Sequence, residues 1–239
     1  MDTPGYNQRL FEGRGWRARL HRARFIWLRE ALRQHSCTPE SVIELGCFDA
    51  KTLDYLPAPP ERYLGLDANW EGGLDLAQER ARPGIELVQC SHPEHIPAGE
   101  CFQVGVCMET LEHLPPELVE PYLAALAARV SSLLFVTAPN EKGLPFAVKY
   151  LSRWLLGLKP ERYNAAEFVN AVLGRMDGIS RDEHKGFDYA VLLAQIDVHF
   201  EILAVESILI GWLPAAHSTG IGIIASPRTA CKNESAGYG

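Results

Sequence analysis

Apolar residues recur along the chain with two periods, and their alternation predicts the order of the secondary structure. Five apolar runs have the length of strands, and most are bounded by Gly, Pro or Asp: Val42–Leu45, Tyr63–Leu66, Ile85–Gln89, Gln103–Cys107 and Leu133–Thr137. Stretches with helical spacing separate them, near residues 51–56, 72–82 and 116–131. Strands that alternate with helices indicate βαβ units. We therefore predict a parallel sheet with helices on both faces.

The segments on either side of this core complete the predicted architecture. Residues 14–35 have the spacing of an Arg-rich helix within an N-terminal helical cap, 1–37. After Pro139, residues 143–180 form a predicted helical lid insertion, and three helices are expected at Leu144–Leu158, Asn164–Leu173 and Asp188–His199. The last apolar runs, Phe200–Ile210 and Thr219–Ala225, have no helix between them and should pair as an antiparallel hairpin. The prediction is an α/β, Rossmann-like, seven-stranded, mostly parallel sheet in a single domain, 1–228, followed by a flexible tail, 229–239.

Composition narrows the class of protein without changing this fold. The 239 residues are 47% hydrophobic and 22% charged, which is ordinary for a globular domain and excludes collagen, coiled coil and disorder. The net charge is −7, which argues against nucleic acid as the main partner because such binding depends on phosphate neutralisation. The charge is uneven, since residues 1–35 carry eight Arg and three acids, net +5.

Cysteine usage and the N-terminus bear on the compartment. The six cysteines include no Cys-x-x-Cys pair, and several lie in apolar runs. This favours six reduced thiols over a disulfide framework. The first ten residues lack the apolar core of a signal peptide, and no stretch has the length of a membrane-spanning helix. We therefore expect a cytoplasmic protein.

Two strand ends carry residues that indicate a cofactor site. The first strand ends in Glu44-Leu45-Gly46-Cys47, and the next ends at Asp67. Ligands of open α/β sheets bind outside the carboxyl ends of the strands, where Gly46 permits close approach of the backbone. The residues after Gly46 include Phe48 and Ala50 rather than further glycines, which argues against the pyrophosphate cradle of a dinucleotide fingerprint. Asp67 can accept both hydroxyls of a ribose, or it can simply cap the next helix.

Over about residues 40–140 the sequence resembles the class I S-adenosylmethionine-dependent methyltransferases. The segments that carry the resemblance are Glu44–Cys47, Gly65–Asn69, Phe102–Pro115 and Val136–Asn140. It implies S-adenosyl-L-methionine as cofactor, with these binding residues: Glu44, Gly46, Cys47 and Phe48 for the methionine part, Asp67 and Ala68 for the ribose, Cys90 and Ser91 for the adenine, and Met108 and Glu109 after the fourth strand. The chain departs from the family in having no acid near Cys90, and Ala50 where many relatives have Gly.

A cluster after the fourth strand indicates catalysis. Glu109, Glu112 and His113 have the spacing i, i+3, i+4, which on a helical turn places them on one face. Their oxygen ligands favour Mg²⁺ or Mn²⁺, and the imidazole favours Mn²⁺ or another first-row ion. Zn²⁺ is not excluded, although no cysteine has ligand spacing here. Metal-free methyltransferases also carry a Glu-His pair at this point, where it orients the loop.

A later segment supports the metal hypothesis. Arg181–Tyr189 resembles a segment of metal-dependent RNA 3′-terminal 2′-O-methyltransferases, in which a Glu-x-x-Glu-His cluster and a later His bind the metal. Here His184 precedes Phe187-Asp188-Tyr189, with Gly186 as an extra residue. Ubiquinone-pathway O-methyltransferases share the Glu-Glu-His part. The resemblance implies a metal site at Glu109, Glu112, His113 and His184, with Glu112, His113 and His184 catalytic. Alternatively, His184 only starts a helix that Asp188 caps.

The lid insertion has an apolar helical face made by Leu144, Val148, Leu151, Leu155 and Leu158, with Phe146, Tyr150 and Trp154 nearby. Packing on the sheet is the simplest interpretation of most of these residues, and we expect it. The other interpretations are a lid over the acceptor and a lipid contact flanked by Lys149, Arg153 and Lys159. The Arg-rich first helix is either a solvated face or part of a site for an anionic acceptor.

These features predict an O-methyltransferase that acts on a vicinal diol. A cation that binds two adjacent hydroxyls would lower the pKa of one and align it with the sulfonium methyl. The Asn/Asp-Pro-Pro-aromatic signature of amino methylation is absent, since Met108-Glu109-Thr110-Leu111 stands there. The expected acceptors are a glycan terminus, a glycolipid sugar or a sugar-bearing small molecule, with a peripheral membrane contact if the lipid interpretation holds. The alternatives are a metal-free methyltransferase of a phenol or carbon, and a non-catalytic relative that binds a partner.

Overall fold

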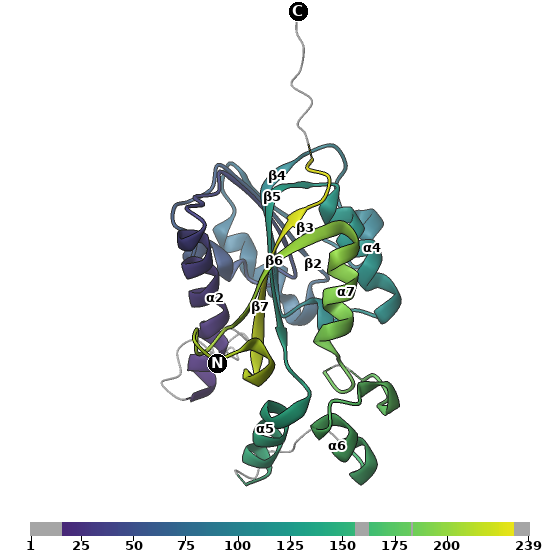
Figure 1. Cartoon of the computed structure of the whole chain (residues 1–239). Coiled ribbons are helices and arrows are strands. Elements are labelled where there is room, and N and C mark those ends of the chain that lie inside the picture. The colour runs from purple at the N-terminus through teal and green to yellow at the C-terminus, as the bar shows by residue number, and fades with distance from the viewer. Residues whose placement is uncertain (1–15, 156–162, 183, 232–239) are drawn as a thin grey trace, which may run out of the picture.

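The computed structural model describes residues 16–155, 163–182 and 184–231, and these form one seven-stranded sheet (Figure 1). The strands are β1 Ser41–Leu45, β2 Arg62–Asp67, β3 Ile85–Gln89, β4 Phe102–Met108, β5 Val130–Pro139, β6 Phe200–Ser207 and β7 Gly220–Pro227. Their order is β3-β2-β1-β4-β5-β7-β6, and β7 runs antiparallel to both of its neighbours. The predicted parallel sheet with a terminal antiparallel hairpin is confirmed.

Helices cover both faces of this sheet. The α-helices of the described residues are α2 Trp16–Gln34, α3 Gly73–Ala77, α4 Pro116–Ala127, α5 Gly143–Leu155, α6 Ala165–Val172 and α7 Tyr189–His199. Of these, α5 and α6 lie beyond one end of the sheet and cover neither face (Figure 1). The helices α4 and α7 pack on one face through residues such as Leu123 and Ile196, and α2 packs on the other through Leu28 (Figure 1). Each of these three side chains is fully buried. The helix predicted at residues 14–35 is confirmed as α2.

Three predicted helices are shorter in the structure. The first crossover contains only a 3₁₀ turn, Lys51–Asp54, and the second contains α3 followed by another 3₁₀ turn, Gln78–Arg80. The helix expected to run to residue 131 ends at Ala127. Val130 instead begins β5, because it pairs with Phe102 of β4. Helical spacing alone could not reveal that competing strand pairing.

The expected packing of the lid helix on the sheet is wrong for the part of α5 that the structure describes. Leu144, Val148, Leu151 and Leu155 are all exposed, by 49 to 75%, whereas Phe146 on the opposite face is buried. Phe146 packs with α6 and the segment after it, so this insertion has a small core of its own. Hydrophobic spacing defines a helix face but not its partner. Leu158 and Lys159 lie outside the described residues. None of the described helices is both long and apolar enough to cross a membrane.

The expectation of six free thiols is also wrong in this structure, because Cys101 and Cys231 form a disulfide. Their separation of 130 residues gave no spacing signal. Tertiary structure brings them together, since Cys101 precedes β4 and the backbone N–H of Cys231 donates to the carbonyl of Val130 at 3.4 Å. The start of the predicted flexible tail is thus tethered, and residues 232–239 lie outside the described part. Cys37, Cys47, Cys90 and Cys107 are free.

Candidate functional site

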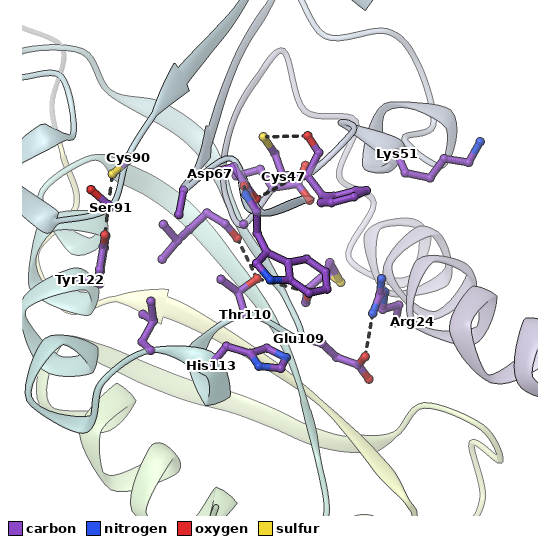
Figure 2. Close-up of a pocket in the computed structure, with 18 of the residues that line it drawn as sticks. Arg24, Cys47, Lys51, Asp67, Cys90, Ser91, Glu109, Thr110, His113 and Tyr122 are labelled. Carbon is purple, nitrogen blue, oxygen red and sulfur yellow. Dashed lines mark hydrogen bonds and ion pairs between the residues drawn. The ribbon is translucent and has the colours of Figure 1, made fainter. Parts of the chain in front are cut away.

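A cavity of about 670 Å³ opens at the carboxyl ends of β1, β2 and β4 (Figure 2). Cavities of this size commonly hold cofactors. All ten predicted cofactor-binding residues line it: Glu44, Gly46, Cys47, Phe48, Asp67, Ala68, Cys90, Ser91, Met108 and Glu109. The cavity walls also include His113 and His184, which the sequence suggested for catalysis. Parallel strand topology therefore brings together residues that lie up to 140 positions apart in the chain.

The loop after β1 is shaped by close contact with the loop after β4. Gly46 has a φ of +75°, and a Cβ added there would lie 2.1 Å from Oγ1 of Thr110. The Thr110 hydroxyl donates to the carbonyl of Leu45 at 3.2 Å, which joins the two loops. Ala50 also adopts a left-handed conformation, with a φ of 53°. Ala50, which stands where many of the methyltransferases that the sequence resembles have Gly, thus still adopts the conformation of a tight turn.

Asp67 organises the backbone around the middle of the cavity. One carboxylate oxygen accepts from the N–H of Phe48 at 2.9 Å, and the other accepts from Asn69 at 2.8 Å and Trp70 at 3.3 Å. Asp67 is not the N-cap of the next helix, because Asn69 precedes the 3₁₀ turn Trp70–Gly72 and Gly72 precedes α3; it orders the backbone of the two loops instead. A cavity-lining carboxylate has further lone pairs, so these bonds leave room for the predicted ribose contact.

Glu44 is buried beneath the cofactor loop and is fully engaged in hydrogen bonds. Its two carboxylate oxygens accept from the hydroxyls of Thr52 and Tyr63, each at 2.5 Å. Burial raises the pKa of Glu44 to about 8, although the two hydrogen bonds act in the opposite direction. The side chain thus holds the start of the cofactor loop to β2.

The first helix contributes a residue that the sequence analysis did not select. Arg24 of α2 reaches the cavity wall and donates through Nη1 to Glu109 at 2.7 Å (Figure 2). Its Nη2 lies 3.2 Å from Nε2 of His21. Burial, followed by repulsion from Arg24, lowers the pKa of His21 to about 3, so this imidazole is a neutral acceptor. Eight arginines in residues 1–35 made this one indistinguishable in the sequence.

Three of the four predicted metal ligands come together in a group that we call the Glu-His-His cluster: Glu112, His113 and His184. One ligand atom from each lies within 4.8 Å of the others. The residues after β4 form a 3₁₀ turn rather than the expected α-helical face, and Glu109 turns toward Arg24 instead. A left-handed backbone at Glu109, with a φ of 51°, breaks the helical spacing.

The segment that carries His184 is docked against the 3₁₀ turn. Arg181 donates through Nη2 to the carbonyl of Glu112 at 2.6 Å, and its guanidinium lies over the ring of Phe187. The imidazoles of His113 and His184 are 4.5 Å apart between centroids. Asp188 caps α7 by accepting from the N–H of Ala190 at 2.9 Å, so the predicted capping role is confirmed.

Two members of the Glu-His-His cluster, Glu112 and His184, have buried polar atoms without a hydrogen-bond partner in the described part of the chain, whereas His113 is exposed. Glu112 is 1% exposed, and neither of its carboxylate oxygens has a hydrogen bond within the described residues. The same is true of Nδ1 of His184. Burial, followed by repulsion from Glu109, raises the pKa of Glu112 well above its ordinary value. Burial, followed by repulsion from His113, lowers the pKa of His184 to about 4.

Comparison with known proteins identifies the fold. Neither a protein-family model nor a curated protein matches the sequence. Solved structures do match, among them the N-methyltransferase NodS of Bradyrhizobium japonicum WM9 in complex with S-adenosyl-L-homocysteine, at 10% identity and a TM-score of 0.60, covering 94% of each chain. The chain has a methyltransferase fold.

Two further methyltransferases share this fold. The methyltransferase domain of bacterial CtHen1 matches at 18% identity and a TM-score of 0.57, covering 87% of this chain and 99% of that one. Magnesium protoporphyrin IX methyltransferase of Synechocystis PCC 6803, with bound S-adenosyl-L-homocysteine, matches at 15% identity and a TM-score of 0.53, covering 95% and 90%.

The donor set in this methyltransferase fold suits a divalent cation. Neutral imidazoles and one carboxylate are ligands of first-row metals, and a buried carboxylate without a hydrogen-bond partner is costly unless something compensates it. A bound cation would favour the ionised form of Glu112 and so reverse its pKa shift. Glu112, His113 and His184 thus fit a metal ion in charge and donor type.

Proposed function

We propose that the chain is an S-adenosyl-L-methionine-dependent O-methyltransferase that methylates one hydroxyl of a vicinal diol with the help of a divalent cation. The observation that carries this proposal is the Glu112 carboxylate, which is buried without a partner beside two histidines of the cavity wall. Such an arrangement is unfavourable in an empty protein and becomes favourable when a cation binds.

The cofactor part of the proposal rests on the cavity. The predicted residues for the methionine, ribose and adenine parts follow one another along its walls, and similar folds were crystallised with S-adenosyl-L-homocysteine. In this arrangement Asp67 would accept the ribose hydroxyls. Cys90 and Ser91 would flank the adenine, and the backbone from Gly46 to Phe48 would face the amino-acid part.

The chemistry follows from the position of the Glu-His-His cluster at the acceptor side of the cavity. A bound Mn²⁺ or Mg²⁺ would supply Lewis acidity, which lowers the pKa of a coordinated sugar hydroxyl. Glu112 would contribute the negative charge of the ligand set. His113 or His184 would accept the hydroxyl proton if it is not engaged as a ligand.

For the acceptor we propose a sugar diol on a glycan terminus, a glycolipid or a sugar-bearing small molecule. The overall charge of −7 argues against RNA. The exposed apolar stripe of α5 is formed by Leu144, Val148, Leu151 and Leu155. This apolar surface on the insertion suits an acceptor with a lipid part.

Methyl transfer to matched acceptor pairs tests the proposal. Each pair contains a sugar with a vicinal diol and its deoxy counterpart, assayed after chelation and after addition of Mn²⁺, Mg²⁺ or Zn²⁺. We expect transfer to diols only, restored by Mn²⁺ or Mg²⁺. Full activity after exhaustive chelation would remove the metal from the proposal and leave a histidine as plain general base. Transfer to a phenol, a carbon or an amine, but to no diol, would overturn the acceptor assignment.

A further inference from the structure

Glu109 is the one predicted metal ligand that lies outside the Glu-His-His cluster, and its carboxylate forms an ion pair with Arg24 instead. The Nη1–Oε2 distance is 2.7 Å, and the Arg24 side chain is only 12% exposed. Arg24 also donates toward His21 and lies over the ring of Phe25, with its guanidinium 4.9 Å from the ring centroid. Arg24 therefore has contacts on several sides, and the Glu109 side chain is the more exposed of the two.

The main chain of Glu109 is held in place, so a change of partner has to come from rotation of its side chain. Its backbone N–H donates to the carbonyl and the hydroxyl of Thr137, at 3.1 and 3.0 Å, so the main chain is fixed to β5. Its side chain, in contrast, is 35% exposed. The residue is three and four positions before Glu112 and His113, and its charge acts on Glu112 and His184. The Glu109 carboxylate thus interacts electrostatically with two members of the Glu-His-His cluster.

Arg24 lies at the end of the cavity where the cofactor would carry its own carboxylate. Cys90, Ser91 and Tyr122 form the opposite end, Asp67 lies between, and Arg24 and Lys51 are on the far side (Figure 2). An adenine beside Cys90 and a ribose at Asp67 would direct the amino-acid part toward Arg24. Lys51 is already paired with Asp54 at 2.7 Å. A carboxylate arriving here therefore competes with Glu109 for Arg24.

We propose that the Arg24–Glu109 ion pair is a latch that couples the cofactor to the metal. When the carboxylate of the cofactor takes Arg24, Glu109 is released and becomes a fourth ligand at the Glu-His-His cluster. No covalent bond changes, and only the partners of two carboxylates are exchanged. The latch rests on the proposed function, since it needs both a cofactor and a cation. It would keep the cation weakly bound until the methyl donor is in place.

Linkage gives the latch a measurable signature. If S-adenosyl-L-homocysteine tightens Mn²⁺ binding, Mn²⁺ must tighten S-adenosyl-L-homocysteine binding by the same factor. We expect roughly tenfold, within the usual range of coupling between sites. 5′-Methylthioadenosine retains adenine and ribose but has no carboxylate, so it should bind without tightening Mn²⁺ binding. 5′-Methylthioadenosine therefore distinguishes an effect of the cofactor carboxylate, which binds Arg24 and releases Glu109, from an effect of filling the cavity.

Titration calorimetry of the whole protein with Mn²⁺ tests the latch without any acceptor. We expect Mn²⁺ to bind about tenfold tighter with S-adenosyl-L-homocysteine than without it. Glu109→Gln should retain binding of both ligands and lose the coupling. Arg24→Gln should bind Mn²⁺ tightly even without the nucleoside, because Glu109 is then free. Arg29→Gln, which removes an exposed arginine of the same helix, should behave as the wild type. Thermal melting of each variant checks the fold.

The two proposals fail in different ways. Equal Mn²⁺ affinity with and without S-adenosyl-L-homocysteine would overturn the latch and leave the metal site intact. Unchanged coupling in Glu109→Gln would also overturn it, because another group would then carry the effect. No binding of any divalent cation in either state would overturn the metal site and the latch together.

Discussion

Glu44 and Glu112 are both buried glutamates close to the ends of neighbouring strands, yet their surroundings are opposite. Both carboxylate oxygens of Glu44 accept hydrogen bonds from hydroxyls, whereas those of Glu112 accept none within the described residues. Burial raises the pKa of both. The difference separates two tasks. In the proposed function, the half of the site that binds the cofactor, called here the complete half, has its hydrogen bonds without a ligand. The half that binds the acceptor, called here the acceptor half, has buried polar atoms without a hydrogen-bond partner in the described residues.

Substitutions in the Glu-His-His cluster should produce the largest effect, a loss of methyl transfer. Single Ala substitutions at Glu112, His113 or His184 should lower methyl transfer by about a hundredfold or more, the range for loss of Lewis-acid or acid–base help. In the proposed function the three residues hold one cation and act as a unit, so double substitutions should cost little more than single ones. Steady-state turnover of an identified acceptor measures this.

The control for that series is His199→Ala on α7, which removes a histidine paired with Glu120 away from the cavity. It should keep normal turnover. The affinity for S-adenosyl-L-homocysteine should change little in the three cluster variants. A fall in affinity equal to the fall in turnover would show that the acceptor half serves cofactor binding instead.

In metal-free protein, replacement of Glu44 should lower the free energy of unfolding, whereas replacement of Glu112 should leave it unchanged or raise it. Glu44→Ala leaves the fully buried hydroxyls of Thr52 and Tyr63 without their acceptor, which should cost roughly 2–5 kcal/mol of the free energy of unfolding. Glu112→Met removes a polar group that has no partner, so the free energy of unfolding should stay the same or rise by about 1–2 kcal/mol. Urea denaturation in the presence of a chelator measures both. Equal destabilisation by the two changes would contradict the comparison.

Asp67 belongs to the complete half of the site, and its replacement should weaken cofactor binding. Asp67→Ala should reduce the affinity for S-adenosyl-L-homocysteine by roughly 1–3 kcal/mol, because the ribose hydroxyls lose their acceptor. Part of the loss will come from the backbone N–H groups of Phe48 and Asn69, which Asp67 also holds. Calorimetry checks this, with the exposed Asp75→Ala on α3 as control. Unchanged affinity would remove Asp67 from the cofactor site.

The raised pKa of Glu44 predicts that the free energy of unfolding depends on pH. The expected change per pH unit is smaller than the effects of the substitutions above. Folding raises this pKa from 4.5 to about 8, so between these values the folded protein holds a proton that the unfolded chain has released. Stability from this carboxyl is full below pH 4.5 and is lost as the pH rises toward about 8, by up to about 1.4 kcal/mol per pH unit. The difference in unfolding free energy between wild type and Glu44→Gln should fall over this window. Parallel stability curves would show that Glu44 does not titrate there.

Much of the fold was predictable because local signals agreed with the tertiary structure. The five parallel strands, the terminal hairpin and the first helix all follow from periodicity. The strand-end residues Gly46 and Asp67 were recognisable because sheet topology requires ligands at that edge. Helix lengths were less accurate. Val130 joined β5 instead of α4 because pairing with Phe102 outweighed helical spacing.

What the sequence by itself determined is the order of the elements and the kinds of donor groups at the strand ends. Tertiary structure decided which of those groups meet. It placed Arg24 of the first helix against Glu109, brought His184 to Glu112 and His113, and joined Cys101 to Cys231. It also turned the apolar stripe of α5 outward. Each of these contacts joins distant segments or faces, and periodicity reports only on neighbours within one helix or strand.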